Sequence, residues 1–178
     1  DGDTSTNDSV IGFAAGEPLQ EKYWNDLQLG LNKVSQYLAK AIARDGEGAS
    51  CLIEVKVVGT DTDYEAKKIA LTICGSSLVK TAIHGSDPNW GRIVAAAGRA
   101  NVLFNNKDLS LWIGSFQLLQ SGEPIAFNRD EISQYITKKI NGDYLRDDCV
   151  SITLRVGQGV GYALSWGCDL SEEYVRIN

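Results

Sequence analysis

The sequence predicts an α/β fold in which layers of helices cover a central sheet, followed by a smaller α+β portion. Segments with an apolar residue at every third or fourth position, typical of helices, alternate along the chain with segments in which every second residue is apolar, typical of strands. Hydrophobic residues make up 43% of the 178 positions and charged residues 22%, so the chain can bury a substantial core and is not disordered. A chain of this length forms one ordinary domain or two small ones.

The first long helix is predicted over residues 18–43. Apolar residues recur there at helical spacing and mark one buried face: Leu27, Leu31, Val34, Leu38 and Ile42. A short apolar strand is expected before this helix, over residues 9–14. A second strand is predicted over residues 51–58, because apolar residues alternate there with Glu54 and Lys56.

The segment GTDTD, residues 59–63, follows the second predicted strand. A junction between a strand and a helix can place catalytic groups at the end of the strand. Thr62 and Glu65, however, have the spacing of a capping box for the next helix. We therefore interpret Asp61, Thr62 and Asp63 as capping residues.

The stretch TAIHGSDPNWGRI, residues 81–93, has the chemistry of a joint between two helices. Gly85 can adopt the left-handed conformation that ends the first helix, and Asp87 can cap the second. Pro88 then falls at the first helical position, where its missing N–H is not needed. The second helix is expected over residues 90–97, with one apolar face.

The second half of the chain alternates short apolar runs with turns. Strands are predicted over residues 102–104, 109–113, 116–119, 125–127, 150–156, 162–166 and 174–177. One helix interrupts them, from Asn128 to a stop at Gly142. Residues 158–163, QGVGYA, have the spacing of a coenzyme A pyrophosphate motif, but that motif requires its glycines to open a helix. We interpret residues 157–161 as a hairpin turn.

Composition excludes several classes of protein. The net charge is −6 and the pI about 4.8, and Lys and Arg are scattered, so a nucleic-acid binder is disfavoured. No apolar run approaches the roughly 20 residues of a membrane span. Four cysteines without C-x-x-C spacing and a single histidine argue against a zinc site and favour reduced, structural thiols: Cys51, Cys74, Cys149 and Cys168. The absence of methionine indicates a fragment, a processed product or part of a longer protein.

Three polar features have both a structural and a functional interpretation. Residues 1–8, DGDTSTND, alternate like a calcium-binding EF-hand loop, but Thr6 and Gly12 stand where that loop needs glycine and glutamate. We favour a turn-rich loop over a polar pocket wall. His84 near a predicted helix end is expected to be hydrogen-bonded rather than a general base. Glu47 lies between two glycines, which let a backbone approach a ligand, although a lone loop glutamate is more often solvated.

Four stretches, in order and from one end of the chain to the other, resemble the C-terminal (beta) chain of the glutamate N-acetyltransferase (ornithine acetyltransferase) family. They are DGDTSTND at 1–8, RDGEGA at 44–49, residues 59–70 together with 81–93, and WGCDLSEEYVRIN at 166–178. The resemblance implies a layered helix–sheet–helix fold of the ornithine acetyltransferase type. It also implies an acetyl transfer from N-acetylornithine to glutamate in arginine biosynthesis, through an acetyl-threonine intermediate. Some family members also accept acetyl-CoA as donor.

The resemblance carries two substrate-binding residues onto this chain, Glu47 in RDGEGA and Asn178 at the end of YVRIN. An amino-acid substrate presents an ammonium, which a carboxylate can hold, and a carboxylate, which an amide can bridge. No catalytic residue is expected in this chain, because the family's nucleophilic threonine precedes DGDTSTND by a few dozen residues. No metal and no cofactor are implied. Asp87, Asn89 and Trp90 belong to a family motif, and we interpret them as scaffold.

By the same resemblance, residues 1–76 are expected to form part of the main layered domain, completed by the upstream polypeptide. Residues 77–178 would form the smaller α+β portion, with a final strand that returns to the active site. The implied partner is the N-terminal (alpha) chain of the same precursor, in a heterotetramer of two alpha and two beta chains. The implied location is the cytoplasm, or an organelle in a eukaryote. Two alternatives stay open: an aminopeptidase-like hydrolase with an N-terminal nucleophile, and a non-catalytic small-molecule-binding domain.

Overall fold

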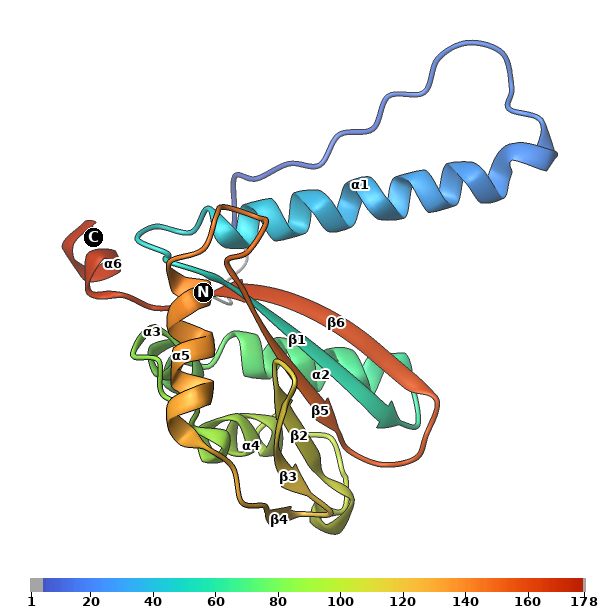
Figure 1. The fold of residues 1–178 in the computed structure, drawn as a ribbon. Coiled ribbons are helices and arrows are strands. Elements are labelled where there is room, and N and C mark those ends of the chain that lie inside the picture. The colour runs from blue at the N-terminus through green and yellow to red at the C-terminus, as the bar shows by residue number, and fades with distance from the viewer. Residues whose placement is uncertain (1–4, 178) are drawn as a thin grey trace.

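A six-stranded sheet with helices packed on it forms the centre of the computed structural model, which describes residues 5–177 (Figure 1). The strand order is β4-β3-β2-β5-β1-β6, and β1 and β5 are parallel neighbours whereas the other pairs are antiparallel. The strands are β1 (Leu52–Thr60), β2 (Ser110–Ile113), β3 (Phe116–Gln120), β4 (Glu123–Pro124), β5 (Cys149–Arg155) and β6 (Gly161–Cys168). The predicted α/β class is confirmed.

The helices agree with most of the predicted helical segments. They are η1 (Glu21–Tyr23), α1 (Trp24–Arg44), α2 (Asp63–Cys74), α3 (Ser77–His84), α4 (Trp90–Gly98), η2 (Asn106–Asp108), α5 (Arg129–Ile140) and α6 (Glu172–Ile177). The capping box at the start of α2 is present, because Glu65 N–H donates to Thr62 Oγ1 and Thr62 N–H donates to Glu65 Oε2. None of the helices in the described part of the chain has the length and apolar character needed to cross a membrane.

The core is formed by the sheet and by the buried faces of α2, α3, α4 and α5. Val55 and Val57 of β1 stand in register with Ile152 and Leu154 of β5, and all four are fully buried. Residues of the opposite face, such as Glu54, are only partly buried. Since β1 precedes residue 77 and both its partners follow it, the sheet itself joins the two parts of the chain. The domain boundary near residue 77 remains a prediction.

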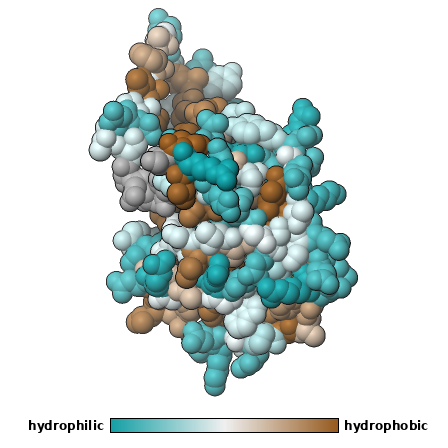
Figure 2. All heavy atoms as spheres, turned by 90° about the vertical axis from the view of Figure 1, so that its left-hand side faces the viewer, coloured by the Kyte–Doolittle hydropathy of each residue, from teal (hydrophilic) through white to brown (hydrophobic). Residues whose placement is uncertain are grey.

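Helix α1 extends away from the sheet, as Figure 1 shows. Its predicted apolar face is present but exposed, and the helix contains no buried residue: Leu27, Leu31, Val34, Leu38 and Ile42 are each at least 50% exposed. In Figure 2, hydrophobic residues gather over the upper part of the molecule, where α1 lies. The prediction of a buried face is therefore wrong for this chain by itself. The helix meets the sheet only near its C-terminal end, where Lys40 Nζ lies 3.0 Å from Glu54 Oε2.

The joint between α3 and α4 exists, but its residues differ in role from the prediction. Ser86, with φ of 52°, adopts the left-handed conformation, whereas Gly85 has φ of −78°. The cap of α4 is Asn89, which accepts from Arg92 N–H, and Pro88 precedes the helix. Asp87 instead points to Arg129, whose Nη2 lies 2.5 Å from Asp87 Oδ1. The Asp87 carboxylate therefore binds Arg129, which is distant in the sequence, and does not cap α4.

Several short predicted strands are absent or replaced. Residues 9–14 and 102–104 form no strand. Strand β4 occupies Glu123–Pro124 and ends directly before the predicted run 125–127. Residues 174–177, predicted as a strand returning to the active site, belong to the helix α6. Ser171 and the two glutamates that follow it provide a helix start that outweighs the β-branched residues, since Ser171 Oγ accepts from Tyr174 N–H at 3.3 Å. Residues 157–161 connect β5 to β6 without a helix, but β1 lies between these two strands in the sheet. The predicted hairpin turn is therefore wrong, because the connection passes over the end of β1 and the two strands do not pair.

The four cysteines are unpaired thiols, as predicted from their apolar surroundings. Cys51, Cys74 and Cys168 are buried, and Cys149 is partly exposed. Burial raises the pKa of Cys74 to about 12, and burial together with Glu54 raises the pKa of Cys149 to about 11. The pKa of Cys51 is raised further by burial and by the carboxylate of Asp169.

We expect thiol titration of the denatured, non-reduced protein to count four free thiols. In the native protein near neutral pH, Cys51 and Cys74 should react far more slowly than in the denatured protein, because they are buried and protonated. Mass spectrometry after timed alkylation measures each site. A disulfide in the non-reduced sample would contradict the prediction.

Candidate functional site

The loop that carries Glu47 joins the end of α1 to the start of β1 and is held by Arg44. The Arg44 guanidinium donates to Ala49 O at 2.9 Å and to Ser50 O at 3.1 Å, and its Nε pairs with the carboxylate of Asp148. The Asp148 side chain is almost completely buried. Arg44 is thus the last residue of a helix and also the clamp on the loop that follows it.

Asp169, just after β6, holds the same loop from the other side. Its fully buried carboxylate accepts from Ser50 N–H at 2.8 Å, Ser50 Oγ at 2.5 Å and Cys51 N–H at 3.0 Å. His84 Nδ1, at the end of α3, lies 2.7 Å from the same carboxylate. Burial alone would raise the pKa of Asp169, but the hydrogen bonds from Ser50, Cys51 and His84 outweigh it and hold this pKa below its ordinary value.

The glycines on either side of Glu47 allow the loop to lie against the C-terminal segment. Gly48 has φ of +66°, and a Cβ there would stand 2.6 Å from Tyr174 N. A Cβ at Gly46 would stand 2.7 Å from Cys168 Sγ. Ser171 Oγ donates to Gly48 O at 2.6 Å. The glycines predicted to allow close approach therefore serve first to seat the loop on β6 and α6.

Glu47 lines a hollow of about 350 Å³ between this loop, α3 and the end of β6. The lining comprises Gly46, Glu47, Lys80, Cys168, Asp169, Leu170 and Tyr174. Lys80 is only 4% exposed, and its Nζ lies 3.9 Å from Cys168 Sγ. The hollow thus brings together an acidic and a basic side chain, which suits a small zwitterionic ligand such as an amino acid.

His84 is hydrogen-bonded near a helix end, as predicted. Because a carboxylate only accepts, Nδ1 carries the proton toward Asp169, and Nε2 is the other ring nitrogen. His84 is absent from the lining of the hollow with Glu47. We therefore interpret His84 as a structural residue that hydrogen-bonds Asp169 and holds its carboxylate in place.

The other residues singled out from the sequence lie elsewhere. Asn89 Nδ2 donates to Asp87 Oδ2 at 3.0 Å, and Trp90 packs against the core, which supports their interpretation as scaffold. Asn178 lies outside the described residues, as do the first four residues of DGDTSTND. Of that stretch, Ser5 Oγ accepts from Asn7 N–H and Asp8 N–H at 3.1 Å each, the geometry of a polar turn.

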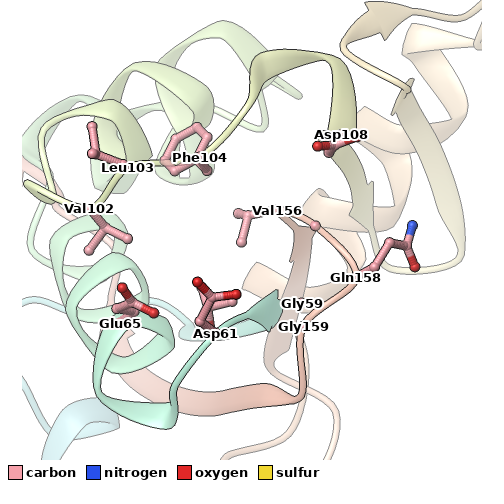
Figure 3. Close-up of a pocket in the computed structure, with 12 residues that line it drawn as sticks. Gly59, Asp61, Glu65, Val102, Leu103, Phe104, Asp108, Val156, Gln158 and Gly159 are labelled. Carbon is pink, nitrogen blue, oxygen red and sulfur yellow. The ribbon is translucent and has the colours of Figure 1, made fainter.

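A second hollow, of about 230 Å³, lies at the other end of β1 (Figure 3). Asp61 and Glu65 stand on one side of it, and Leu103 and Phe104 on the other. Since β1 is nine residues long, the two hollows are on the order of 30 Å apart. Glu65 is engaged in the capping box of α2, so its position is explained without a ligand.

The sequence analysis missed Lys80 and Asp169. A signal for Lys80 was available, because it stands among the apolar residues of α3 and is itself buried with Val79 and Ile83. Asp169 gave no local signal, since its partners at Ser50, Cys51 and His84 are more than 80 positions away.

We predict that Asp169→Asn lowers the free energy of unfolding by about 1.5–3 kcal/mol, the usual effect of losing hydrogen bonds to a charged group. Asp147→Asn, at an exposed position, is the matched control.

The difference in unfolding free energy between wild type and Asp169→Asn should depend on pH, because the folded pKa of Asp169 is depressed. It should be complete above the unfolded pKa of about 3.9 and should vanish as the pH falls through the folded pKa. Denaturant unfolding at several pH values measures it, and equal stabilities of wild type and Asp169→Asn near pH 7 would contradict it.

Comparisons with known proteins agree with the resemblance inferred from the sequence. A family model described as the ArgJ family matches residues 1–178. The arginine biosynthesis bifunctional protein ArgJ of Prochlorococcus marinus (strain MIT 9313) is 58% identical over 178 residues, which are 100% of this chain and 42% of the relative. ArgJ 1 of Nostoc sp. (strain PCC 7120) is 52% identical over 184 residues, covering 100% of this chain and 45% of the relative.

The fold agrees as well. The crystal structure of arginine biosynthesis bifunctional protein argJ from Bacillus halodurans matches with a TM-score of 0.91 and 42% identity, covering 100% of this chain and 83% of the crystal chain. The chain thus spans less than half the length of the curated relatives but most of the crystal chain. With its whole length matched by the family model and its fold shared with a solved member, the chain belongs to the ArgJ family.

Proposed function

We propose that this chain is the C-terminal chain of an acetyltransferase that moves acetyl from N-acetylornithine to glutamate in arginine biosynthesis. The observation that carries the proposal is the hollow around Glu47, found in a chain whose relatives are named for arginine biosynthesis. A carboxylate on one wall and a buried ammonium on another match a small amino acid in both size and charge. The relatives' names refer to arginine biosynthesis, which favours a biosynthetic transferase over the hydrolase alternative.

In the proposed reaction, Glu47 accepts hydrogen bonds from the substrate's amino group. The loop clamped by Arg44 and Asp169 fixes the position of this carboxylate before substrate arrives, so little ordering entropy is lost on binding. The acetyl group passes from N-acetylornithine to a threonine nucleophile outside this chain, which releases ornithine. It then passes to the amino group of glutamate bound in the same hollow, which regenerates the threonine hydroxyl. This is a ping-pong scheme, in which acetyl-CoA is a further candidate donor. No cofactor takes part in either step.

We propose further that the chain works together with an N-terminal chain of the same precursor, as two copies of each. The exposed apolar face of α1 supports this, because such a face is stabilised by burial against a partner. The lengths of the relatives support it too. The chain covers 83% of the crystal chain but 42% of a full relative, so that crystal chain is about half as long as a whole ArgJ protein. We place the enzyme in the cytoplasm, or in an organelle in a eukaryote.

The first test of the function is Glu47→Ala in the two-chain protein. Loss of a charge-assisted hydrogen bond to the amino group is expected to lower kcat/KM for acetyl transfer by roughly ten- to a few hundredfold. Glu123→Ala, an exposed glutamate in β4 at the far edge of the sheet, is the matched control and should transfer normally. Self-cleavage of the precursor should be largely spared in both variants. Unchanged transfer kinetics in Glu47→Ala would refute the assignment.

The second test concerns the partner chain. Expressed alone, the 178 residues should self-associate or be poorly soluble, because the face of α1 is uncovered, and they should not transfer acetyl from N-acetylornithine. Co-production with the N-terminal chain and its threonine should give a heteromer with activity. Light scattering with size-exclusion chromatography and a transfer assay measure both properties. A well-behaved monomer that transfers acetyl unaided would show the partner proposal to be wrong.

A further inference from the structure

We propose that Lys80 binds the α-carboxylate that the donor and the acceptor amino acids have in common. This inference rests on the proposed acetyl transfer and assigns to this chain the group that recognises the anionic end of the substrate. Lys80 lies on α3 and lines the same hollow as Glu47. Glu47 lies in a different segment, the loop between α1 and β1.

The first argument is the burial of an ammonium without a counter-charge. Lys80 is 4% exposed, and in the described part of the chain it forms no ion pair. The one hydrogen-bond partner of its Nζ there is the Cys168 thiol, at 3.9 Å, and a thiol is a weak acceptor. Buried charges in proteins are ordinarily paired, because desolvation of an isolated ammonium is costly. A buried lysine on the wall of a hollow, with no ion pair among residues 5–177, therefore points to an anion that comes from outside.

The second argument is that the neighbouring carboxylate is already engaged. Asp169 also lines the hollow, but its oxygens accept from Ser50, Cys51 and His84. These contacts satisfy Asp169 as a structural anchor and leave the charge of Lys80 available to a ligand.

The third argument comes from the chemistry of the two substrates. N-acetylornithine and glutamate carry side chains of opposite charge, so a single site cannot recognise both through the side-chain end. Both carry an α-carboxylate. A cation fixed at one position on α3, opposite in sign to Glu47, can hold that shared group in each half of a ping-pong reaction and so present the reacting nitrogen at the same place.

The alternative is a purely structural lysine, whose methylene groups fill space beside Cys168. The two roles differ in one measurable respect. Replacement of a structural lysine lowers kcat/KM for every substrate alike. Replacement of a carboxylate-binding lysine lowers kcat/KM only for substrates that carry the carboxylate.

The test is a two-by-two comparison of acetyl donors in the two-chain protein. N-acetylputrescine is N-acetylornithine without its α-carboxylate. Wild type should prefer N-acetylornithine by roughly ten- to a hundredfold in kcat/KM, the factor expected for one charge-assisted hydrogen bond. In Lys80→Met this preference should fall to within about threefold, chiefly through loss of activity on N-acetylornithine, while Lys80→Arg should keep part of it. An unchanged preference in Lys80→Met, with both donors slowed equally, would overturn the proposal.

Two controls keep the test decisive. Lys67→Met, an exposed lysine on α2, should leave both kcat/KM values unchanged. Lys80→Gln is the second neutral variant if Lys80→Met does not assemble, and thermal unfolding checks that each variant is folded. If wild type transfers no acetyl at all, the proposed function fails, and calorimetric binding of glutamate against 4-aminobutyrate, which lacks the α-carboxylate, still tests Lys80. Equal loss of both ligands in the variant would then overturn the role of Lys80 by itself.

Discussion

The fully buried carboxylate of Asp169 is the contact on which the arrangement of the site depends. It stands just after β6 and receives hydrogen bonds from the start of β1 and from the end of α3, so it connects three segments that are far apart in the sequence. Burying a charge stabilises a fold only when hydrogen bonds replace its water, and removal of the partners of such a charge is strongly destabilising. Although burial acts to raise the pKa of Asp169, hydrogen bonds from Ser50, Cys51 and His84 lower it. Its role is to fix the relative positions of the loop with Glu47 and the helix with Lys80.

Arg44 provides the complementary constraint, with a positive charge where Asp169 provides a negative one. The guanidinium accepts nothing and donates to two carbonyls of the loop, whereas Asp169 donates nothing and accepts from two of its N–H groups. The backbone of residues 49–51 is therefore held through both kinds of polar group. Glu47 is itself exposed, and it lies in a loop whose backbone is so constrained. Rigid support of this kind is what a binding carboxylate needs in order to discriminate between ligands.

The sequence predicted what depends on near neighbours and missed what depends on distant ones. The capping box at Thr62 and the alternation in β1 involve residues within a few positions of one another, and both are present. The cap at Asp87 failed because Arg129, 42 positions away, takes its carboxylate. The strand predicted over residues 174–177 failed because β propensity depends on a neighbouring strand, and in the described part of the chain this segment is a helix beside the Glu47 loop. The binding role of Glu47 came from a family resemblance, whereas the positions of Asp169 and Lys80 beside it became evident only in the folded structure.

The exposed face of α1 and the candidate site are physically connected through Arg44. Helix α1 ends at Arg44, and Arg44 is the residue that clamps the loop of Glu47. Lys40 and Glu54 join the helix to the sheet near this end, while the apolar face of the helix stays exposed in the described part of the chain. Burial of that face by a partner restricts the motion of the whole helix, and thereby of Arg44. Assembly with the proposed N-terminal chain would then bring in the nucleophile and, by the same contact, rigidify the carboxylate that holds the substrate, so that a competent pocket forms only where the threonine is also present.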